Sequence, residues 1–67
     1  MSYTDVQHNA IEIAFQWGRP AWIVLDLLER GLRVFCGPHE EYIHGQPLRY
    51  FPIEIVSPDG VRECVVE

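Results

Sequence analysis

GRPAWIVLDLLERG, residues 18–31, is the stretch that decides the expected fold of this chain. Pro20 suits the first position of a helix, where its fixed φ is favourable and its missing N–H costs nothing, and Gly31 provides a stop. The apolar side chains between them cover an arc of about 200° on a helix, twice what a surface helix needs. These side chains are Ile23, Val24, Leu25, Leu27 and Leu28. The stretch therefore predicts a helix over 20–30 with more apolar surface than a small protein easily buries.

Trp22 does not fit the polar side of this expected helix. Only Asp26, Glu29 and Arg30 would face water there, and Trp22 projects between them. Aromatic side chains that are exposed beside polar groups are typical of binding hot spots. The expected partner-binding residues are Trp22, Asp26, Glu29, Arg30, Ile11, Phe15, Tyr42 and Tyr50. We expect Trp22 to enter a partner's pocket, while the three charged residues form a polar rim. The other apolar residues of 20–30 are expected to pack against a sheet as core.

A first helix is expected to precede this stretch. Thr4-Asp5-Val6-Gln7 has the form of a capping box, which predicts a helix that begins at Asp5, and Gly18 can end it in the left-handed conformation. The expected core face consists of Val6, Ala10, Ile13, Ala14 and Trp17, opposite a polar face of Asp5, His8, Asn9, Glu12 and Gln16. The link at Gly18 and Arg19 is short, so the two helices should be neighbours.

The second half of the chain predicts three strands, at 32–36, 49–56 and 61–66. Ser57-Pro58-Asp59-Gly60 has the composition of a tight turn and predicts a hairpin between the last two. Pro52 cannot donate a hydrogen bond to a neighbouring strand, so its strand should lie at an edge. The strand at 61–66 should then be central, next to 32–36. Residues 37–48 form a long connection, which Tyr42 and Ile43 should anchor.

Charge and length limit the classes of function. The chain of 67 residues fits one domain, 1–67, and a domain of this size is marginally stable. Acidic residues outnumber basic ones, the net charge is −5, and the five basic residues are arginines scattered along the sequence. This pattern disfavours nucleic-acid binding. Residues 1–67 include neither an apolar run long enough for a membrane span nor a signal peptide, so a cytoplasmic protein is expected.

Chemistry-bearing residues gather in and around 37–48. Cys36, His39, His44 and Cys64 are zinc-type ligands, but their spacing matches no standard metal motif. Cys36 and Cys64 allow one disulfide if their strands are adjacent, although buried thiols are the simpler expectation in a reducing compartment. No nucleophile, base and orienting group are arranged in a recognisable pattern, so we expect neither an enzyme nor a cofactor.

These observations predict an α+β fold in which two N-terminal helices pack on a small three-stranded antiparallel sheet with a C-terminal β-hairpin. The expected function is stoichiometric protein binding by a small acidic module. It would be an accessory or inhibitory factor, of the phage or mobile-element kind on size and acidity alone, or a homodimer. One alternative is a metal- or thiol-dependent site at Cys36, His39, His44 and Cys64. A further alternative is a winged-helix nucleic-acid binder, which has the expected order of elements but the wrong charge.

Overall fold

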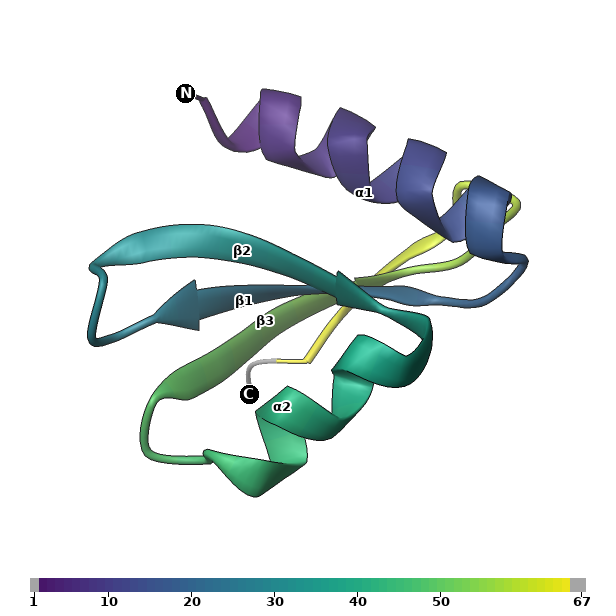
Figure 1. Ribbon diagram of the computed structural model, residues 1–67. Coiled ribbons are helices and arrows are strands. Elements are labelled where there is room, and N and C mark those ends of the chain that lie inside the picture. Colours follow the sequence, from purple (N-terminus) through teal and green to yellow (C-terminus); the bar gives the residue numbers. More distant parts are fainter. Residues whose placement is uncertain (1, 66–67) are drawn as a thin grey trace.

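A computed structural model describes residues 2–65 and places helices on both faces of an antiparallel sheet (Figure 1). Within this range, helix α1 (Tyr3–Trp17) covers one face, and η1 (Gly37–Glu40, a 3-10 helix) with α2 (Glu41–Gly45) lies on the other. The strands are β1 (Ala21–Asp26), β2 (Gly31–Cys36), β3 (Tyr50–Val56) and β4 (Arg62–Cys64), in the order β2-β1-β3-β4. The predicted α+β class is confirmed, but one N-terminal helix and four strands replace the expected two helices and three strands.

Helix α1 begins two residues before the predicted start. The Ser2 hydroxyl accepts a hydrogen bond from the Asp5 backbone N–H at 3.2 Å, and the Ser2 N–H donates to the Asp5 carboxylate at 3.3 Å. This capping box uses Ser2 and Asp5, so the predicted box at Thr4 is wrong. The predicted stop is confirmed, because Gly18 ends the helix with φ of 65°. Val6, Ala10 and Ala14 are buried as expected, Ile13 is partly buried, and Trp17 is half exposed.

The predicted second helix over 20–30 is wrong. Residues 21–26 form β1, which pairs with β2 on one side and β3 on the other, so that Ile23 lies between Val34 and Glu54. A central strand is apolar on both faces, and its continuous apolar run resembles that of a buried helix. Residues 27–30 form the turn of the β1–β2 hairpin. Without the second helix, the order of elements no longer matches a winged helix.

The order of the strands also corrects two expectations. β3 is an inner strand between β1 and β4, so Pro52 does not mark an edge. Pro52 lies where the ladder with β1 is irregular, because the register between the two strands shifts at Ile23/Val24. β4 is an edge strand and does not lie beside β2.

The predicted hairpin turn at 57–60 is confirmed. The N–H of Gly60 donates to the carbonyl of Ser57 at 2.9 Å, and the N–H of Ser57 donates to the carbonyl of Val61 at 2.8 Å. The strand that follows it is shorter than expected, since β4 spans Arg62–Cys64. Position 66 of the predicted strand lies outside the described residues.

The two faces of the sheet have separate apolar cores. The core under α1 joins Val6, Ala10, Ala14, Ala21, Ile23, Cys36 and Val56. The core under α2 joins Val24, Phe35, Ile43 and Tyr50, with Trp22 packed against it. The predicted anchor Ile43 is therefore confirmed, whereas Tyr42 is half exposed. Cys36 and Cys64 lie on β2 and β4, the opposite edges of the sheet, and the possible disulfide between them does not form.

Candidate functional site

The end of the β1–β2 hairpin is held to the rest of the fold by Asp26. Its carboxylate is fully buried and accepts hydrogen bonds from Arg49 Nε at 3.1 Å and Arg49 Nη2 at 3.2 Å. The same carboxylate accepts the backbone N–H groups of Leu28 at 3.1 Å and Glu29 at 3.2 Å. Arg33 Nη1 lies 3.5 Å from it. Asp26 thus fixes the turn at 27–30 and joins it to the segment before β3.

These contacts shift the pKa of Asp26 from 3.8 to about 2, with the hydrogen bond from Arg49 as the largest cause. A carboxyl group whose pKa is lowered on folding stabilises the protein fully above its unfolded pKa and loses that effect as the pH falls. We therefore expect the urea concentration at the unfolding midpoint to decrease as the pH is lowered from about 4 to about 2. This decrease should be smaller in Asp26→Asn, which has no carboxyl group at this position to titrate. Urea titrations of both proteins across this range measure the difference. If the urea midpoint of Asp26→Asn depends on pH as steeply as that of the wild type, Asp26 is not the source of this pH dependence.

An apolar groove lies beside this ion cluster. Leu27 and Leu28 of the β1–β2 turn and Leu48 of the segment before β3 are 51%, 70% and 93% exposed. With Gln46 and Arg49 they line an open groove of about 460 Å³. The hydrogen bond from the Leu27 N–H to the Arg49 carbonyl, at 2.8 Å, holds the two segments together. Leu27 and Leu28 were expected in the core, and the structure places them on the surface instead.

A second, larger cleft of about 610 Å³ adjoins the groove on the face of the sheet that carries α2. Gln46 and Arg49 line both hollows. The other walls of the cleft include Arg33, Phe35, His39, Tyr42 and Tyr50. The Phe35 ring lies 4.9 Å from that of Tyr50 and 5.8 Å from that of Tyr42, and the His39 and Tyr42 rings stack at 5.8 Å. The cleft therefore combines guanidinium groups with an aromatic wall.

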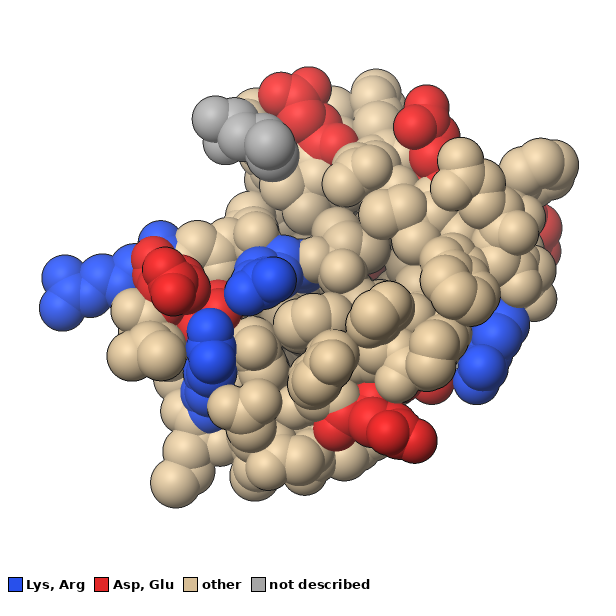
Figure 2. Space-filling model, viewed as in Figure 1, with Lys and Arg blue, Asp and Glu red and all other residues tan. Residues whose placement is uncertain are grey.

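The structure gathers arginines that are scattered in the sequence. Figure 2 shows several blue side chains close together at the end of the molecule where the β1–β2 hairpin lies, with carboxylates beside them. Arg30 and Arg33 belong to the hairpin, and Arg49 is tied to Asp26 of the same hairpin. With Asp26 and Glu29 as the neighbouring acids, this end carries a net charge of +1, in a chain whose net charge is −5.

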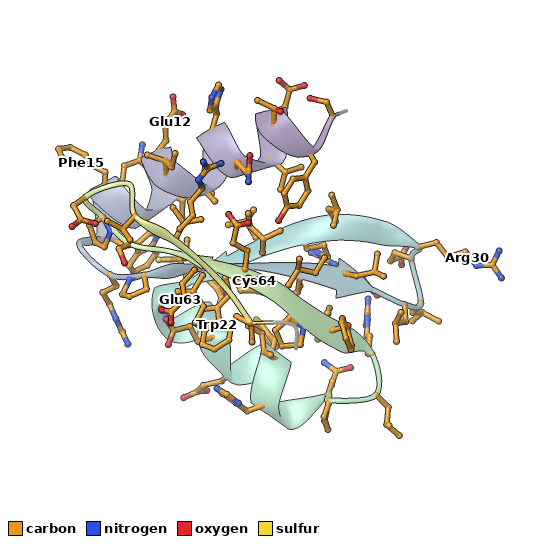
Figure 3. The ribbon with its side chains drawn as sticks, turned by 180° about the vertical axis from the view of Figure 1, so that it is seen from behind. Glu12, Phe15, Trp22, Arg30, Glu63 and Cys64 are labelled. Carbon is orange, nitrogen blue, oxygen red and sulfur yellow. The ribbon has the colours of Figure 1, made fainter. Side chains whose placement is uncertain are left out.

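The predicted partner-binding residues do not form one surface. Asp26 and Tyr50 are buried, and Trp22 is half-buried on the α2 side, with its ring 6.2 Å from that of His44. Glu29 and Arg30 are exposed in the hairpin turn. Phe15 is exposed on α1, at the opposite end of the molecule from Arg30 (Figure 3). Ile11 is partly buried against the core under α1, and Tyr42 lies on α2, on the other face of the sheet.

The Cys and His residues do not come together as a metal centre. Among residues 2–65, the structure contains no group of three or more His, Cys, Asp or Glu side chains able to hold a metal ion. The thiol of Cys36 donates to the carbonyl of Pro20 at 3.3 Å, and burial raises its pKa. His39 and His44 make ring contacts with Trp17 and Trp22. In the described part of the chain, no helix is long and apolar enough to cross a membrane.

Sequence reasoning missed Arg33, Arg49 and Leu48, which line the two hollows. Two β-prone runs of equal length on either side of residues 27–30 would have indicated a hairpin. No protein-family model matches this chain, and neither a curated protein nor a solved structure does so with significance.

Proposed function

We propose that this chain is a small protein-binding module that uses the groove of Leu27, Leu28 and Leu48 as its contact surface. The supporting observation is the high exposure of three leucines that line a single groove. Exposed apolar side chains that are scattered singly are ordinary, whereas a contiguous apolar groove with a polar rim is typical of an interaction site. Gln46 and Arg49 supply polar groups at this groove.

A different protein fits this groove better than a second copy of the chain. A two-fold dimer places the same surface of each copy against the other. Such a dimer would bring Arg30, Arg33 and Arg49 of each copy close to those of its mate, and two chains of net charge −5 also repel at a distance. The proposed occupant is therefore an apolar side chain of another protein. The proposed contact surface for a protein partner is therefore this groove, and not the surface around Trp22 that the sequence predicts.

The test compares the double variant Leu28→Ser/Leu48→Ser with the control Val61→Ser, which changes an exposed apolar residue beside the β3–β4 turn. A partner captured by the wild type is purified and titrated against all three proteins by calorimetry. We expect affinity to fall about tenfold or more in the double variant and to be unchanged in the control. Thermal unfolding of the variants should remain near that of the wild type, because the substituted side chains are on the surface.

Two results would reject this proposal. One is a partner that binds the double variant as tightly as the wild type. The other is light scattering that shows a wild-type dimer and a monomeric double variant, because the groove would then be occupied by a second copy.

A further inference from the structure

Two arginines, Arg33 and Arg49, line the cleft beside the groove. Arg33 and Arg49 both face the carboxylate of Asp26, so two guanidinium groups share one buried negative charge. The side chains of Arg33 and Arg49 are 48% and 27% exposed, and each guanidinium carries more N–H donors than these contacts use. Donors of this kind can bind an oxygen anion that enters from solvent.

The two arginines are held in place before any ligand binds. The Arg33 guanidinium lies 5.5 Å from the centre of the Phe35 ring, and that of Arg49 lies 5.0 Å from the centre of the Tyr50 ring. Asp26 also holds Arg49 through two hydrogen bonds. A donor pair that is already positioned loses little conformational entropy on binding, which favours recognition of an anion.

The aromatic wall indicates what the anion should be attached to. Phe35 and Tyr50 are buried beneath the arginines, whereas Tyr42 is half exposed and His39 is exposed and stacked on it. These outer rings offer an apolar and stackable surface next to the guanidinium groups. A cleft of about 610 Å³ is within the size range of small-ligand sites.

We propose that this cleft is a binding site for an organic anion, in which a phosphate or carboxylate group binds Arg33 and Arg49 and an attached aromatic ring packs against Tyr42 and His39. The site does not depend on the leucine groove, although Gln46 and Arg49 border both. The anion can be a free small molecule or a side chain of a protein partner, and both share this chemistry.

The test is an NMR titration of the full chain with phenyl phosphate, following the backbone N–H signals. We expect saturable shifts at residues of the cleft and at least about tenfold weaker binding in Arg33→Gln. Arg62→Gln, which removes an exposed arginine from β4, should bind as the wild type does. Inorganic phosphate and benzyl alcohol should each bind about tenfold more weakly than phenyl phosphate, because each lacks one half of the ligand.

A second variant keeps the test decisive if Arg33→Gln unfolds. Tyr42→Leu removes a half-exposed ring. It should weaken the binding of phenyl phosphate and leave the binding of inorganic phosphate unchanged. The proposal is overturned if phenyl phosphate gives no saturable shift up to about 10 mM, which corresponds to a free energy of binding too small for a built site. It is also overturned if Arg33→Gln is folded and binds phenyl phosphate as tightly as the wild type.

A further arm distinguishes the two sources of the anion. The probe is an acetylated peptide in which leucine follows phosphotyrosine, chosen because the cleft and the groove share Gln46 and Arg49. If the wild type binds the peptide about tenfold more tightly than phenyl phosphate, and Leu48→Ser removes this tenfold gain, the anion belongs to a protein partner. Equal affinities assign it to a free small molecule. Leu48→Ser should leave phenyl phosphate binding unchanged, so failure of the groove and failure of the cleft give different results.

Discussion

Asp26→Asn should lower the midpoint of thermal unfolding by about 10 °C or more at neutral pH. The side chain is fully buried and is the hydrogen-bond acceptor for Arg49 and for the turn of the β1–β2 hairpin. Asparagine has the same size but no charge, and its amide nitrogen would face the donors of Arg49. Arg33 and Arg49 would then both lose the counter-charge that they share, and Arg49 is partly buried.

Asp59→Asn is the matched control for this substitution. Asp59 also accepts a backbone N–H within a hairpin turn, from Val61 at 3.3 Å, but its side chain is exposed, whereas that of Asp26 is buried. Its substitution should change the midpoint little. Circular dichroism melts of the two variants and the wild type measure the difference. Equal midpoints for Asp26→Asn and Asp59→Asn would show that the cluster at Asp26 does not hold the hairpin.

Local signals were sufficient for α1 and the β3–β4 hairpin. The amphipathic period before Gly18 and the turn composition at 57–60 depend on residues close in sequence, and both were predicted. The segment at 21–26 is different, because a central strand and a buried helix both give an unbroken apolar run. Pro20 and Gly31 are as compatible with the ends of a helix as they are with the observed hairpin. Trp22 does not fit the polar side of the predicted helix, and this misfit indicates that the prediction is wrong. In the strand, Trp22, Val24 and Asp26 lie on the same face of the sheet, because every second residue of a strand points to one side.

The candidate site was less predictable than the fold, since it depends on contacts between distant segments. Asp26 and Arg49 are 23 positions apart, and their ion pair follows only from the antiparallel pairing of β1 with β3. The same pairing brings Leu48 beside Leu27 and Leu28. Composition predicted an excess of apolar surface in 18–31, which the structure confirms for Leu27 and Leu28. Composition does not show that these exposed leucines lie in a turn, because the same residues also fit the pattern of a helix.

Gly37→Ala should lower the free energy of unfolding by about 3 kcal/mol, through backbone strain and a steric clash together. Gly37 follows β2 and has φ of 62°, a conformation that disfavours any side chain. A Cβ atom there would lie 2.8 Å from Cε3 of Trp17. The indole also meets the His39 ring edge-on, so its displacement would disturb the contact between α1 and η1.

Gly18→Ala separates the two causes, because Gly18 has φ of 65° and open space around it. It should cost about 1 kcal/mol, which is the strain alone. In a Trp17→Ala background the clash at Gly37 is removed, so Gly37→Ala should then cost no more than Gly18→Ala does. Urea unfolding of the single and double variants measures this interaction. If Gly37→Ala costs the same in both backgrounds, the penalty is entirely in the backbone, and the close packing of Trp17 on Gly37 does not constrain this position.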